Sequence, residues 1–80
     1  MNDIELFTII MEAREILESD PSIKEIRELN EQNEQALAKS FEKIKEYLDK
    51  KDFEKAKEET MRVQYLKTLQ RELKEKLPAE

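Results

Sequence analysis

The chain is 80 residues long, carries a formal net charge of −5 and contains no cysteine, histidine or glycine. These absences exclude disulfides, zinc sites built on cysteine or histidine, a histidine general base and a glycine-rich phosphate loop. The acidic balance disfavours a nucleic-acid partner, because a phosphate backbone needs a basic surface, and no apolar run approaches the ~20 residues that cross a bilayer. We expect no metal and no cofactor.

The first predicted helix covers residues 3–18, with Asn2 or Asp3 as its N-cap, and carries two apolar stripes. At about 100° per residue, one stripe comprises Leu6, Ile10, Ala13 and Leu17, with Ile9 and Ile16 beside it. Ile4, Phe7 and Met11 form a second ridge, turned away by about 60–120°. One helix of a small bundle needs one buried stripe, so the second ridge predicts a binding surface. A helix at the centre of the bundle would instead bury both stripes, and this alternative stays open.

Asp20-Pro21 predicts the first turn, with Asp20 as N-cap and Pro21 as the first residue of a second helix over residues 21–49. Asparagines and glutamines at residues 30–35 interrupt the apolar pattern and predict a bend or a loosely packed stretch near residues 30–33. The expected buried side of this helix comprises Ile23, Ile26, Leu29, Leu37, Phe41, Ile44 and Leu48.

Lys50-Lys51-Asp52 predicts the second turn, with Asp52 as N-cap of a third helix over residues 53–77. Tyr65 and Met61 point away from the expected buried side, and Tyr65 should lie near the exposed ridge if the first and third helices pack side by side. That buried side comprises Ala56, Val63, Leu66, Leu73 and Leu77, with Phe53, Thr60 and Leu69 at its margins.

Short connections make neighbouring helices antiparallel. The predicted fold class is therefore all-α, an antiparallel three-helix bundle in which a helical hairpin has the first helix packed across it. We expect residues 1–80 to form a single domain.

Three segments carry a family resemblance. They are the run Met-Glu-Ala-Arg-Glu at residues 11–15, Asp52-Phe53 followed by Ala56, and Tyr65-Leu66 followed by Leu69. In this order and spacing they resemble the C-terminal domain of the HscB family, the J-type co-chaperones of iron–sulfur cluster assembly that are called Jac-type in mitochondria. The resemblance covers about residues 3–77.

The resemblance implies a three-helix domain that follows a J-domain, binds an IscU-type iron–sulfur scaffold protein and delivers it to a dedicated Hsp70. Matched position by position, Phe7 and Met11 take the places of the main apolar contacts, and Tyr65 takes that of the aromatic residue on the last helix. Thr8 stands at a neighbouring position that is often apolar. The charged rim is matched by Glu12, Arg14 and Glu15.

The chain departs from the family pattern because it has no His-Pro-Asp motif and no histidine, so no J-domain is present. Hsp70 would then be reached only indirectly. We expect a scaffold-binding co-chaperone module in the bacterial cytoplasm or the mitochondrial matrix. The alternative is a self-associating helical bundle that hides the second ridge in a homodimer.

Two further function classes are disfavoured. Asp3, Glu12 and Glu15 offer carboxylates for acid–base chemistry, but nothing in the sequence supplies a pocket or a desolvating wall. Membrane-surface binding through the first helix would bring an acidic helix against anionic lipid. The sequence therefore predicts a protein-binding module that is not an enzyme.

Overall fold

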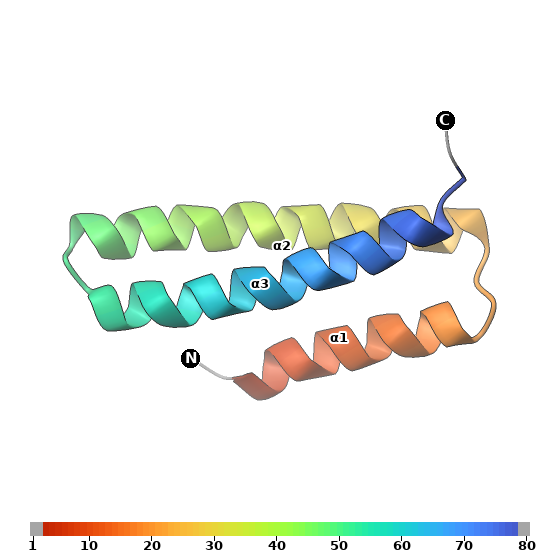
Figure 1. Cartoon of the computed structure of the whole chain (residues 1–80), viewed down its shortest axis with the longest axis horizontal. Coiled ribbons are helices and arrows are strands. Elements are labelled where there is room, and N and C mark those ends of the chain that lie inside the picture. The colour runs from red at the N-terminus through yellow and green to blue at the C-terminus, as the bar shows by residue number, and fades with distance from the viewer. Residues whose placement is uncertain (1–2, 79–80) are drawn as a thin grey trace.

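The computed structural model describes residues 3–78, except the side chains of Asp3 and Glu5. Three helices, α1 (Asp3–Glu18), α2 (Ile23–Asp49) and α3 (Phe53–Lys76), make up most of this range. Helices α2 and α3 form a long antiparallel hairpin, and α1 lies along α3 (Figure 1). The Cα trace measures 43 × 28 × 14 Å, so the three helices form a flattened layer. The predicted all-α three-helix architecture is confirmed.

Helix α3 is the central element of the layer, with α2 on one side and α1 on the other (Figure 1). It buries a broad stripe, and Leu69, which the sequence placed at the margin, is 3% exposed. The helix that packs on two sides is therefore α3, so the alternative in which α1 is central and buries both its stripes is wrong. The apolar core comprises Leu6, Ile10, Ala13, Ile26, Leu37, Val63, Leu66, Leu69 and Leu73.

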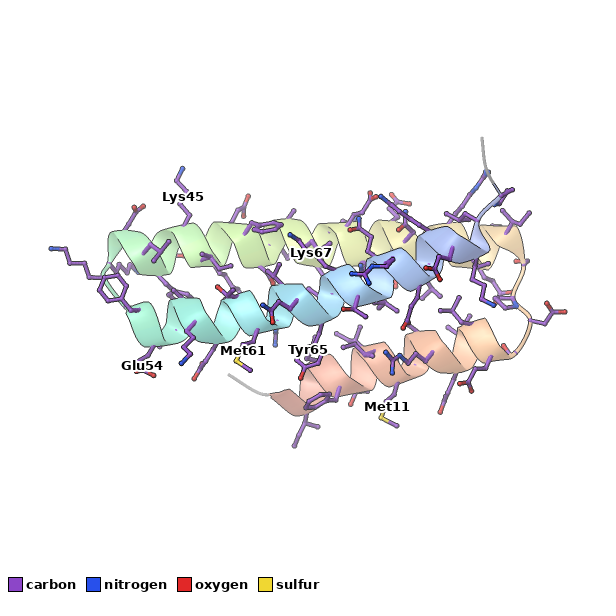
Figure 2. All side chains as sticks on the ribbon, viewed as in Figure 1. Met11, Lys45, Glu54, Met61, Tyr65 and Lys67 are labelled. Atoms are coloured by element: carbon purple, nitrogen blue, oxygen red, sulfur yellow. The ribbon has the colours of Figure 1, made fainter. Side chains whose placement is uncertain are left out.

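Helix α2 buries a narrower stripe than its pattern predicts. Ile26 and Leu37 are buried, but Ile23, Phe41 and Leu48 are each about half exposed, so their assignment to the core is wrong. In a flattened layer α2 packs chiefly against α3, and one neighbour covers less than a full apolar face. The Phe41 ring is instead covered by the ammonium of Lys67, which lies 5.6 Å from the ring centroid. Lys67 is labelled in Figure 2.

The polar middle of α2 neither breaks the helix nor frees it from the core. The helix is continuous from Ile23 to Asp49, without an interruption at residues 30–33. Asn33 is buried, and its side-chain Nδ2 donates a 2.8 Å hydrogen bond to the carbonyl oxygen of Leu66 in α3. Packing is loose here toward α1, where a groove of about 290 Å³ lies between the two helices.

The first turn differs from the sequence prediction in its N-cap. Ser22, and not Asp20, caps α2: its hydroxyl accepts from the Glu25 amide at 3.2 Å, and the Glu25 carboxylate accepts from the Ser22 amide at 3.3 Å. This reciprocal capping box satisfies two otherwise unpartnered amides. Asp20 has a φ of 59° and lies in the turn itself. Helix α2 therefore begins at Ile23, and Pro21 precedes it. Asp3 is the first residue of α1, and Asn2 lies outside the described residues.

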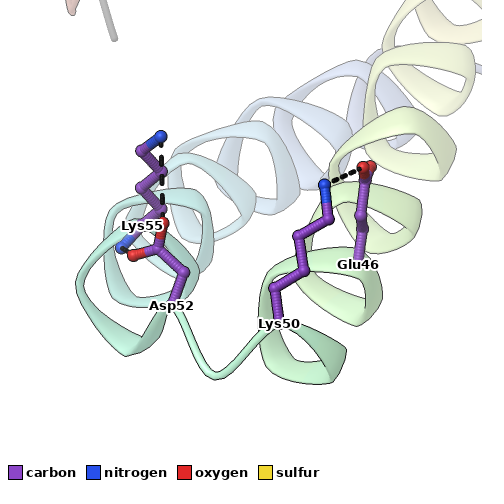
Figure 3. A network of polar contacts seen from close by, with 4 residues as sticks. All are labelled: Glu46, Lys50, Asp52 and Lys55. Atoms are coloured by element: carbon purple, nitrogen blue, oxygen red, sulfur yellow. Dashed lines mark hydrogen bonds and ion pairs between the residues drawn. The ribbon is translucent and has the colours of Figure 1, made fainter.

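The second turn is capped as predicted. The Asp52 carboxylate accepts from the Lys55 amide at 3.4 Å, and Lys51 has a φ of 60°. Two ion pairs flank the turn, Lys50 with Glu46 at 3.1 Å and Lys55 with Asp52 at 3.8 Å (Figure 3). Since the chain lacks glycine, both turns place an ordinary residue in the left-handed region, where a Cβ atom is disfavoured.

Candidate functional site: an exposed apolar face on α1 and α3

The most distinctive surface feature is an aromatic pair that bridges α1 and α3. The ring centroids of Phe7 and Tyr65 lie 5.9 Å apart with an interplanar angle of 71°, an edge-to-face contact. Both side chains remain largely accessible to water, at 48% and 45% exposed. The predicted proximity of Tyr65 to the exposed ridge of α1 is confirmed.

Two contacts fix the register of α1 against α3. Phe7 meets Tyr65, and the Arg14 guanidinium lies 3.3 Å from the carboxylate of Glu72; each pair is separated by 58 residues. The two helices therefore run parallel, and residue i of α1 lies level with residue i + 58 of α3. Two turns of helix separate the aromatic pair from the ion pair, which closes the C-terminal end of this seam.

Met11 extends the surface along α1. It lies one turn after Phe7, is 62% exposed, and projects from α1 away from the hairpin (Figure 2). We call the surface formed by Phe7, Met11 and Tyr65 the apolar face. Thr8, beside it, donates its hydroxyl to the carbonyl oxygen of Ile4 at 2.8 Å. Because that hydroxyl is satisfied within its own helix, Thr8 adds little polarity to the surface.

The predicted charged residues take three different positions. Glu15 is exposed one turn after Met11 and borders the apolar face. Arg14 borders the seam with α3 and is held there by Glu72, a partner that sequence reasoning missed because the register was unknown. Glu12 is exposed too, but it lies at the far edge of α1 and lines the groove toward α2. The three residues therefore border different sides of α1 and do not form one cluster.

The groove between α1 and α2 is chiefly apolar. Ile9 and Ile16 line it from α1, and Leu29 and Ala36 line it from α2. Ile9, which the sequence placed beside the core, is 48% exposed as a result. The apolar surface of α1 is thus only partly covered, both on the side facing α2 and on the side of the apolar face.

Two other kinds of site are absent from the described residues. Within residues 3–78, no group of three or more acidic, histidine or cysteine side chains is arranged to hold a metal ion. In the same range, none of the three helices has the length and apolar character needed to span a bilayer. The apolar face is therefore the candidate site that the structure offers for a partner.

Comparison with known families gives a match over most of the chain. A family model described as the HSCB C-terminal oligomerisation domain matches residues 2–74 of the 80-residue chain. Searches among curated proteins and among solved structures gave no match. The matched range begins before α1, ends within the last turn of α3 and contains every residue of the apolar face and its charged border.

Proposed function

The chain belongs to the family of HscB C-terminal domains, and we propose that it binds an IscU-type iron–sulfur scaffold protein on the apolar face formed by Phe7, Met11 and Tyr65. The family is one of co-chaperones in iron–sulfur cluster assembly and not of enzymes. We propose both the identity of this partner and the residues that contact it.

One observation carries the proposal: the Phe7–Tyr65 ring pair is made at the surface and not in the core. An edge-to-face pair contributes about 0.5–1.5 kcal/mol beyond area burial, so the two rings hold each other in place before any partner arrives. A preformed aromatic contact with a half-exposed surface loses little conformational freedom on binding. Such rigid apolar anchors dominate the energy of protein interfaces.

The charged border supports orientation more than affinity. Glu15, next to Met11, presents negative charge at the border of the apolar face, while Arg14 is tied to Glu72 and Glu12 lies at the groove toward α2. Exposed charges at an interface rim chiefly change the association rate and its dependence on salt. We expect a scaffold with basic residues around its own apolar patch.

The test is to truncate the apolar face and measure scaffold binding by calorimetry. Tyr65→Ala and Met11→Ala should each weaken binding of an apo IscU-type scaffold by about tenfold or more. Helical circular dichroism should be retained in both variants, and Met11→Ala should leave the melting temperature nearly unchanged, because Met11 is 62% exposed. Tyr65→Ala also removes the ring contact with Phe7, so it should lower the melting temperature by several degrees without unfolding the chain. Leu48→Ala is the matched control, since Leu48 is 49% exposed but lies on α2.

The contrary results are equally clear. If both variants unfold while Leu48→Ala remains folded, Met11 and Tyr65 support the fold and the apolar face is not a binding site. If both variants fold and bind the scaffold with unchanged affinity, the scaffold does not use this face.

Self-association is the second candidate function, favoured by the family's description as an oligomerisation domain. A second copy of the chain could cover the same apolar face and remove Phe7, Met11 and Tyr65 from water. Sedimentation velocity across protein concentration separates the two functions. A tight dimer that Tyr65→Ala dissociates would assign the face to self-association, whereas a monomer that binds scaffold would assign it to the partner.

Delivery to an Hsp70 requires a further element. The family mechanism uses the His-Pro-Asp motif of a J-domain, which these 80 residues do not contain. The function proposed for this chain is therefore scaffold binding, with Hsp70 reached only indirectly. We expect this to take place in the bacterial cytoplasm or the mitochondrial matrix.

A further inference from the structure

Met61 is an exposed apolar residue that the proposed contact does not use. It is 53% exposed and lies one turn before Tyr65 on α3. Figure 2 shows Met61 and Tyr65 projecting from α3 on the side where α1 lies. Methionine has a flexible, polarisable side chain that adapts to irregular apolar partners, so its exposure beside an aromatic anchor is informative.

The register of the two helices shows what lies next to Met61. Because residue i of α1 lies level with residue i + 58 of α3, Met61 is level with the first turn of α1. Ile4 stands in that turn, about one residue further along the seam, with a side chain that is 72% exposed. Two large apolar side chains, one from each helix, thus continue the apolar face toward the N-terminal end of α1.

The opposite end of the seam is closed by charge. Two turns beyond the aromatic pair, Arg14 and Glu72 form their 3.3 Å ion pair across the same two helices. The seam is therefore polar at one end and apolar at the other. Along the seam itself, a partner seated on Phe7 and Tyr65 gains apolar burial by extending toward Met61 and meets the ion pair in the other direction.

On the premise that the scaffold binds the apolar face, we propose that the contact extends over Met61 and Ile4. The scaffold segment that covers these two residues is apolar and has basic residues at its border. The direction follows from the asymmetry of the seam. The charge follows from exposed acidic residues at its border: Glu15 lies one turn after Met11, and Glu58 and Glu54 lie in the two turns before Met61.

The border on α3 has the same sign but is less uniform. Glu58 and Glu54 are exposed in the two turns before Met61, and Glu54 projects to the same side as Met61 in Figure 2. Lys57 lies between them and is exposed as well. The nearby Lys55 is engaged with Asp52 at 3.8 Å. The basic residues of the partner should therefore face α1 and Glu58 more than Lys57.

The first experiment measures scaffold affinity for variants of the extension. Met61→Ala and Ile4→Ala should each weaken binding of the apo scaffold protein by about three- to tenfold, with the melting temperature unchanged. The double variant should lose less than the product of the two effects if both side chains contact one segment of the partner. Leu48→Ala again serves as the control, with an exposure close to that of Met61, and should stay within about twofold.

The second experiment tests the charge of the border. Glu58→Gln should lower the affinity by about twofold and make binding less sensitive to salt, because an exposed charge pair is screened. Lys57→Gln should leave the affinity unchanged or raise it. A gain in affinity for Glu58→Gln would overturn the basic border.

Failure of this inference is distinguishable from failure of the proposed function. If Tyr65→Ala weakens binding tenfold while Met61→Ala and Ile4→Ala leave it within twofold, the scaffold binds the apolar face and the extension is wrong. If Tyr65→Ala also leaves binding unchanged, the proposed function is wrong and the extension falls with it. A decrease for Tyr65→Ala, Met11→Ala, Met61→Ala and Ile4→Ala, with Leu48→Ala unchanged, supports both.

Discussion

The α2–α3 hairpin and helix α1 differ in how completely they satisfy their own apolar and polar groups. The hairpin has capped helix starts at Ser22 and Asp52, a buried amide link from Asn33 to Leu66, and a central helix whose leucines are almost fully buried. Helix α1 packs along α3 and leaves a groove beside α2. It also exposes Ile4, Phe7, Ile9 and Met11.

This difference indicates that the hairpin chiefly stabilises the fold and that α1 chiefly presents a binding surface. A chain of this size buries only a modest core, so each large apolar residue kept at the surface reduces what is available for stability. The hairpin supplies most of the core, and α1 needs only Leu6, Ile10 and Ala13 to dock on it. The remaining apolar residues of α1 are then available for a partner.

The largest expected effect separates the two regions by core truncation. Leu73→Ala in α3 should lower the free energy of unfolding by about 3–4 kcal/mol, because Leu73 is fully buried at the centre of the layer. Ile10→Ala in α1 should cost about 2 kcal/mol, at the low end for such truncations, since α1 has one packed neighbour. Urea unfolding followed by circular dichroism gives both values.

Hydrogen exchange sharpens the same comparison. Ile10→Ala should speed amide exchange in α1 while the α2–α3 amides keep their protection, as expected for a locally opening element. Leu73→Ala should speed exchange in all three helices. Equal losses of stability and uniform exchange for the two variants would contradict the view that the hairpin is the stable part of the fold.

Much of the fold could be predicted from helical periodicity and turn residues, but the choice of neighbours could not. Periodicity correctly separated Leu6 and Ile10 from Phe7 and Met11, because a difference of one residue turns a side chain by about 100°. It could not show that α3 is central. Phe41 was therefore assigned to the core, although the layer leaves that side of α2 uncovered.

Local chemistry limited the remaining predictions. Asp20 and Ser22 are both good N-cap types, and the Glu three residues after Ser22 decides between them through the capping box. For the candidate site, the sequence predicted that Tyr65 could meet the ridge of α1. The 58-residue register that pairs Arg14 with Glu72, and sets Met61 beside the first turn of α1, required the packed structure.

An intermediate effect concerns Glu59, a buried acidic residue of α3. Glu59 is 2% exposed, and its Oε2 atom is buried without a hydrogen-bond partner in a cavity of about 240 Å³ between α2 and α3. Burying an unsatisfied polar group is unfavourable, so Glu59→Leu should raise the free energy of unfolding by about 1–2 kcal/mol. Thermal and urea unfolding measure the change.

The matched control for Glu59→Leu is Glu42→Leu, at an exposed position of α2, which should change stability by less than about 0.5 kcal/mol. Scaffold affinity should be unchanged in both variants, because neither residue belongs to the apolar face. A loss of stability for Glu59→Leu would show that the buried carboxylate supports the hairpin, most simply through the lysines that line the same cavity, Lys43 and Lys55.

The smallest effects compare the two turns directly. Lys51, in the hairpin turn, and Asp20, in the turn after α1, both have a φ near 60°. Removing the Cβ atom at this position relieves backbone strain, but glycine also gains conformational freedom in the unfolded chain. Lys51→Gly should therefore raise the free energy of unfolding by about 0.5–1 kcal/mol. Aspartate tolerates this region better than lysine, so Asp20→Gly should gain less, about 0–0.5 kcal/mol. Urea unfolding measures both gains. A larger gain at Asp20 than at Lys51 would mean that the link to α1, and not the hairpin turn, is the more strained connection, which would reverse the comparison between the two regions.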